Sequence, residues 1–150
     1  MYRTHNNGEL RLQDVNSEVT LCGWVAKRRN FGALVFIDLR DRYGITQLVF
    51  NEDIAKQISD VRNEYVLQVK GTVVERKDKN PKLATGEIEV VVREVKIVNT
   101  AITTPMIIAD ETDALEDTRL KYRYLDLRRP VLQKNLILRN RITLLVRNYL

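Results

Sequence analysis

The stretch VTLCGWVAKRRNFGALVFIDLRDRYGITQLVF (residues 19–50) decides the fold. It contains three runs of apolar and β-branched residues, VTLCGWVA, ALVFIDL and ITQLVF, and such runs favour strands. The segments NFG (30–32) and DRYG (41–44) separate these runs and carry residues that are typical of turns. The stretch therefore predicts three consecutive strands joined by short turns.

The residues that follow complete the pattern of a small barrel. Apolar residues at helical spacing over 51–61 predict a short helix. EYVLQVKGTVVER (64–76) and EIEVVVREVKIVN (87–99) predict two further strands, the first with a bend or bulge at Gly71. Three strands, a helix and two strands form the order of a mainly-β OB-fold, a five-stranded Greek-key barrel. The helix disfavours the alternative, a small barrel of the SH3 kind.

The C-terminal third of the chain differs from the barrel region. Pro105 and the acidic stretch 106–118 are typical of a linker, because the polar core of that stretch has no apolar stripe to bury. After Pro130, residues 131–150 place their leucine, isoleucine and valine side chains on one broad face, which predicts a helix. This helix reaches Leu150 without a capping or breaking residue, so we expect the chain to be part of a longer protein.

Composition excludes several classes of protein. The 150 residues are 44% hydrophobic and 30% charged, and no apolar run approaches the roughly 18 residues of a membrane span. The first thirty residues lack the apolar segment of a signal peptide, so we expect a cytoplasmic protein without membrane partners. Cys22 is the only cysteine, which excludes an internal disulfide and a cysteine-based zinc site. The net charge of +5 favours an anionic partner, although an ordinary solvated surface explains it equally well.

The chain carries few residues that could perform catalysis. His5 is the only histidine and lies in a polar N-terminal arm, with no serine or cysteine that the sequence pairs with it. The six glycines are scattered and form no phosphate-binding loop. Glu87 and Glu89 alternate onto one face of a strand, but two carboxylates alone make a weak metal site. We therefore predict no catalytic residue and no metal site in these 150 residues.

One strand predicts a surface for single-stranded nucleic acid. Alternation in residues 33–40 places Val35, Ile37 and Leu39 on one face and Phe36 on the other. If the aliphatic trio fills the barrel, Phe36 stands outside it as a platform on which a base can stack. Alternation alone leaves open the inverse arrangement, in which Phe36 is an ordinary core residue.

Polar residues near Phe36 extend this predicted surface. Lys27, Arg28 and Arg29 form the densest basic cluster of the barrel region and suit contacts with phosphates or guanine edges. Gln47 lies between apolar residues, and its amide suits the Watson–Crick edge of a base. The alternatives are a solvated strand end for the basic cluster and a plain outward polar residue for Gln47.

The segment RYLDLRR (123–129), followed by Pro130, resembles the signature at the start of the catalytic domain of class IIb aminoacyl-tRNA synthetases. This family comprises the aspartyl, asparaginyl and lysyl enzymes, each with an N-terminal anticodon-binding OB-fold. MYRTHNNGELR, the stretch 19–50, RNEYVLQVKGTVVER and ATGEIEV are similar to the bacterial aspartyl branch. Lysyl enzymes usually begin with a longer helical arm, and asparaginyl enzymes usually differ around FIDLRDRYG.

The resemblance implies which residues contact the aspartate anticodon. The exposed aromatic of the family stacks on the central uracil, and Phe36 matches it, while Gln47 matches a residue that contacts the same base. Glu89 resembles an acid that reads the third base. The family commonly has arginine where this chain has Lys27, so a bidentate contact is not expected there. The full set implied for tRNA binding is Lys27, Arg28, Arg29, Phe36, Gln47, Arg76, Asn80 and Glu89.

The resemblance also implies a domain organisation and an activity. It divides the chain into an anticodon-binding OB-fold (1–105), a hinge (106–122) and the start of a class II catalytic domain (123–150). The full-length enzyme would be a homodimer that uses ATP and magnesium to ligate aspartate to its tRNA. These 150 residues contain no match to the ATP-binding arginines of the family, so we expect them to bind tRNA without cofactors and to be catalytically inactive. The alternative is a stand-alone OB-fold module for single-stranded nucleic acid.

Overall fold

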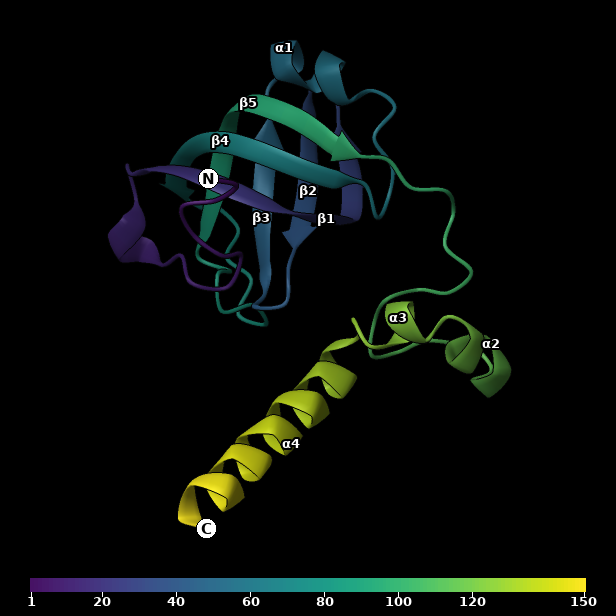
Figure 1. Cartoon of the computed structure of the whole chain (residues 1–150). Coiled ribbons are helices and arrows are strands. Elements are labelled where there is room, and N and C mark those ends of the chain that lie inside the picture. The colour runs from purple at the N-terminus through teal and green to yellow at the C-terminus, as the bar shows by residue number, and fades with distance from the viewer. The chain divides into compact units, whose positions relative to one another are not determined.

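A computed structural model describes all 150 residues of the chain, and these form two compact units, residues 1–103 and 104–150. The first unit is a closed five-stranded barrel (Figure 1). Its strands are β1 (Glu18–Phe31), β2 (Leu34–Arg40), β3 (Ile45–Phe50), β4 (Val66–Glu75) and β5 (Ile88–Asn99). They follow the order β1-β2-β3-β5-β4 around the barrel, and only the β3–β5 pairing is parallel. This confirms the predicted OB-fold.

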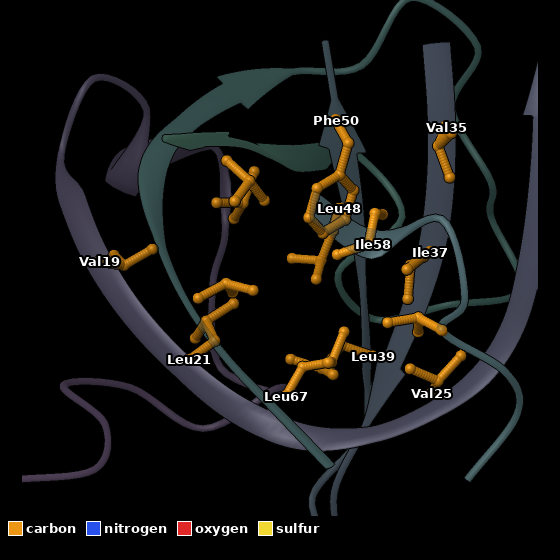
Figure 2. Close-up of a cluster of buried hydrophobic side chains, with 14 of the residues drawn as sticks. Val19, Leu21, Val25, Val35, Ile37, Leu39, Leu48, Phe50, Ile58 and Leu67 are labelled. Atoms are coloured by element: carbon orange, nitrogen blue, oxygen red, sulfur yellow. The ribbon is translucent and has the colours of Figure 1, made fainter. Parts of the chain in front are cut away.

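The inward-facing side chains of the strands form one apolar core (Figure 2). On β2 the buried residues are Val35, Ile37 and Leu39, as the alternation predicts. Fully buried side chains from other parts of the barrel join them, including Leu10, Leu21, Val25, Leu48, Phe50, Leu67 and Ile88. Because this trio fills the barrel, Phe36 points to the outer face of β2.

The turn between the first two strands differs from the prediction by two residues. Strand β1 continues to Phe31, which pairs with Leu34, so the connection is Gly32 and Ala33. Gly32 has a φ of 58°, a left-handed conformation that glycine adopts without steric cost. Pairing therefore extends into the segment NFG, because the glycine at its end, rather than the asparagine, makes the turn.

The predicted helix and bulge are both present. The helix consists of one α-helical turn, α1 (Glu52–Ala55), and a 3-10 turn, η2 (Lys56–Ile58), and α1 lies over one end of the barrel (Figure 1). Ile58 contributes a fully buried side chain to the core. The pairing of β4 with β5 shifts register between Lys70 and Gly71, which is the predicted bulge. A Cβ atom at Gly71 would collide with the carbonyl oxygen of Val91, so only glycine fits there.

The second unit contains three helices, α2 (Glu116–Lys121), α3 (Arg123–Asp126) and α4 (Pro130–Tyr149). The stretch that the sequence indicated as a linker supplies Met106 and Ile108, which are buried against Leu125 of α3. Helix α4 matches the predicted C-terminal helix, and none of its residues is buried within this unit. None of the helices combines the length and apolar character of a membrane-spanning helix. The division of the chain into an OB-fold, a hinge and the start of a catalytic domain, with boundaries after residues 105 and 122, stays a prediction.

A buried carboxylate organises the turn before α4. Asp126 is fully buried and accepts hydrogen bonds from Arg119 at 3.1 Å, Arg123 at 3.2 Å and Arg129 at 3.0 Å; we call these four residues the Asp126 cluster. Desolvation by burial raises the pKa of Asp126, but the hydrogen bonds and charges of Arg119 and Arg129 outweigh it and leave the pKa below its ordinary value. The segment RYLDLRR therefore contains the anchor of this small unit.

Candidate nucleic-acid interface

The outer faces of β1, β2, β3 and β5 place most of the predicted binding residues side by side. Arg29 on β1 pairs with Phe36 on β2, and Phe36 pairs with Val49 on β3. On the same face of β3, Gln47 is two residues from Val49 and contacts Glu89 of β5. Because these strands pair directly, residues far apart in the sequence share one surface.

These residues line a groove of about 500 Å³. The lining consists of Arg29, Phe31, Leu34, Phe36, Gln47, Val49, Arg76, Lys77, Asp78 and Glu89. Five of the eight predicted site residues are in this set, namely Arg29, Phe36, Gln47, Arg76 and Glu89. The groove therefore combines an apolar floor with charged and amide groups, a composition that suits a base attached to a phosphate backbone.

Phe36 is half-buried on the outer face and contacts a second aromatic ring. The ring of Phe31 lies edge-on to that of Phe36, with centroids 5.6 Å apart and an interplanar angle of 88°. Phe31 is 64% exposed and lines the groove, although the sequence predicts a turn at this position. The sequence feature that could place Phe31 at the groove is its position at the end of a strand, two residues after Arg29.

Four polar side chains at the groove form a continuous chain of hydrogen bonds, which we call the groove network. The Nη2 atom of Arg29 donates to Asp38 at 2.8 Å and to the Oε1 atom of Gln47 at 3.0 Å. The Nε2 atom of Gln47 donates to Glu89 at 2.7 Å. The Nε atom of Arg29 is buried and has no hydrogen-bond partner. The Arg29 side chain as a whole is 34% exposed and lines the groove, so part of it can contact a ligand.

Gln47 is more enclosed than the sequence indicated. The alternative of a plain outward polar residue does not fit, because only 6% of Gln47 is exposed. The bonds to Arg29 and Glu89 give its amide a single orientation, with the oxygen toward the cation and the nitrogen toward the carboxylate. Each end of a primary amide keeps one further hydrogen-bonding position, so Gln47 can still contact a base.

The basic cluster at 27–29 divides into residues with different surroundings. The Nη1 atom of Arg28 donates to the carbonyl oxygens of Ile58 and Val61. It therefore attaches the α1–η2 segment to β1, and it does not line the groove. Lys27 is exposed and also lies outside the groove lining. Alternation along β1 places Arg28 on the opposite face from Lys27 and Arg29, and of these two only Arg29 lines the groove.

Asn80 shapes the loop between β4 and β5 and does not line the groove. Its Oδ1 atom accepts a hydrogen bond from the backbone of Lys82, and its backbone nitrogen donates to Gly86. Gly86 packs so closely that a Cβ atom there would collide with the carbonyl oxygen of Asn80. This loop carries Arg76, Lys77 and Asp78 at its start, so its shape determines where three groove residues lie.

Two family profiles match the chain. The profile described as an OB-fold nucleic acid binding domain matches residues 19–98, and that described as tRNA synthetases class II (D, K and N) matches residues 115–150. The first covers the barrel strands and the groove. The second covers α2, α3 and α4, including the Asp126 cluster.

Curated relatives and solved structures agree with these profiles. The chain is 54% identical over its whole length to an aspartate–tRNA ligase of Bacteroides thetaiotaomicron and 53% identical to one of Mycoplasma mycoides. It spans 26% of the length of each. An aspartyl tRNA synthetase structure from Entamoeba histolytica has a TM-score of 0.75 at 21% identity, covering 83% of this chain and 32% of that one. At that identity the likeness supports the fold.

Proposed function

The chain belongs to the family of OB-fold nucleic acid binding domains, and from this membership we propose that its groove binds the anticodon of an aspartate tRNA. The observation that carries the proposal is the position of Phe36 beside the groove network. An exposed aromatic ring offers a stacking surface that accepts any base, and the adjacent amide and guanidinium offer directional hydrogen bonds. Together they suit one unpaired base that is stacked and read at its edge.

We further propose that the whole protein is an aspartate–tRNA ligase. Whole-length identity of 54% to such a ligase and the class II synthetase profile over 115–150 support this, and that profile also disfavours a stand-alone barrel. The proposed enzyme is a homodimer that uses ATP and magnesium. These residues contain no group of three or more histidine, cysteine, aspartate or glutamate side chains that could hold a metal ion. Because the chain spans 26% of the length of these ligases, the proposal assigns ATP and magnesium to the remainder of the enzyme.

Titration of the 150-residue chain with a fluorescent RNA stem-loop tests the anticodon proposal. The probe carries the aspartate anticodon GUC, and two controls carry a permuted anticodon and an unstructured single strand of equal length. We expect the GUC loop to bind most tightly. The logarithm of its affinity should fall with the logarithm of salt concentration, by about 0.7 per phosphate neutralised. Equal affinity for all three RNAs would instead indicate a general single-strand binder, and no binding would contradict the proposal.

A further inference from the structure

Asp38 belongs to the groove network but lies outside the groove. Its carboxylate accepts a 2.8 Å hydrogen bond from Nη2 of Arg29, and it is absent from the groove lining. Its side chain is 19% exposed, whereas that of Arg29 is 34% exposed. Asp38 therefore contacts the groove through Arg29.

The geometry makes the orientation of two groove residues depend on that contact. The same Nη2 atom of Arg29 that binds Asp38 also binds Oε1 of Gln47. A guanidinium is planar, so fixing Nη2 between two acceptors fixes the direction of Nε, the buried donor without a partner. The far end of the Gln47 amide is held by Glu89, which sets its second hydrogen-bonding direction.

Charge adds to this dependence. The groove network contains two carboxylates, Asp38 and Glu89, and one cation, Arg29. If Asp38 lost its charge, Arg29 would lose its only carboxylate partner, the one that competes with RNA phosphates for its guanidinium. A freed guanidinium can bind any phosphate, a contact that carries no base information, and it no longer presents fixed donors to a base edge.

We propose that Asp38 is a positioning residue for base recognition, holding Arg29 and, through it, Gln47 in the orientation that distinguishes one base from another. The inference rests on the proposed function. It predicts that loss of the Asp38 charge removes discrimination between bases while general RNA binding persists. An ordinary surface ion pair would leave discrimination unchanged, because such pairs contribute little.

Three variants of the 150-residue chain test the inference. Asp38→Asn removes the charge and keeps the shape, Asp38→Glu keeps the charge, and Asp60→Asn is the matched control at an exposed carboxylate outside the groove lining. Each is titrated with GUC and GCC stem-loops, which differ only at the central base. We expect the preference for GUC to fall about tenfold in Asp38→Asn and to remain in the other two.

A spectroscopic readout separates positioning from stability. In ¹⁵N–¹H spectra of the free protein, the Nε–H signal of Arg29, assigned by its absence in Arg29→Lys, should be protected from solvent exchange. We expect Asp38→Asn to lose this protection without a change in its urea midpoint. Unchanged preference and protection in Asp38→Asn would overturn the inference, as would equal weakening of both stem-loops with a lowered midpoint. A wild-type chain that binds neither stem-loop would overturn the proposed function itself.

Discussion

The groove network and the Asp126 cluster are both built from arginines and carboxylates, but they differ in how completely their groups are paired. In the Asp126 cluster three guanidiniums converge on one fully buried carboxylate. In the groove network Asp38 binds a partly exposed arginine, Arg29, and Glu89 binds Gln47, while the Nε atom of Arg29 has no partner. The first arrangement is complete within the chain, whereas the second keeps hydrogen-bonding capacity for another molecule.

The comparison shows how similar residues can serve stability or recognition. Arg129 of the Asp126 cluster also donates to the carbonyl oxygens of Ala109 and Asp110, and Asp110 in turn accepts from the backbone of Val131 at the start of α4. These bonds tie three segments of the second unit together. The groove network ties together strands that the barrel already holds by pairing, so its polar groups add little to the fold and are available for binding.

Removing the carboxylate of the Asp126 cluster should have the largest effect. Asp126→Ala leaves Arg129 buried without its charged partner, and we expect a cost of about 3–5 kcal/mol to the second unit. Hydrogen exchange of backbone amides over 119–133 measures this loss, with Asp113→Ala, an exposed acid in the same unit, as the control. Unchanged protection in Asp126→Ala would show that the apolar contacts of Leu125 suffice.

The next largest effect should come from Arg28, whose role contrasts with that of Arg29. We expect Arg28→Ala to lower the free energy of unfolding of the barrel by about 1.5–3 kcal/mol, because it removes charged hydrogen bonds to Ile58 and Val61. RNA affinity at a temperature where the variant is folded should remain close to that of the wild type. A large affinity loss without destabilisation would place Arg28 at the RNA instead.

Phe36→Ala should give the opposite result. The ring lies outside the barrel core, so we expect the free energy of unfolding to change by under about 1 kcal/mol. The free energy of stem-loop binding should weaken by about 1–3 kcal/mol. Urea titration and fluorescence anisotropy measure the two quantities, and Tyr43→Ala, an exposed aromatic outside the groove lining, is the control. Strong destabilisation with normal binding would remove Phe36 from the proposed interface.

The smallest expected effect is a gradual loss of stability of the second unit as acid protonates Asp126. The folded pKa of Asp126 lies below its ordinary value of 3.8, so its charge stabilises the second unit fully above that value. This stabilisation should fall as pH drops below 3.8 through the folded pKa. Comparing hydrogen exchange over 119–133 in the wild type and Asp126→Asn between pH 5 and pH 3 isolates the contribution. Equal pH dependence in both proteins would exclude Asp126 as its source.

The sequence by itself determined the order of the strands along the chain, a bend or bulge at Gly71 and the fact that Phe36 and the trio Val35, Ile37 and Leu39 lie on opposite faces of one strand. These features depend on local rules, since side chains alternate along a strand and glycine permits close backbone approach. The burial of that trio decided that Phe36 points outward. Of the five proposed site residues that line the groove, residue patterns indicated Arg29, Phe36 and Gln47, and only the resemblance indicated Arg76 and Glu89.

Only the tertiary structure decided which polar groups meet. Gln47 bonds to residues 18 and 42 positions away, to Arg29 across the pairings of β1 with β2 and of β2 with β3, and to Glu89 across the parallel contact of β3 and β5. The same packing brings Arg28 to the α1–η2 segment and Arg29 to the groove, although the two are adjacent in the chain. Alternation predicts that their side chains diverge, but the partners they find depend on long-range packing, which no local pattern encodes.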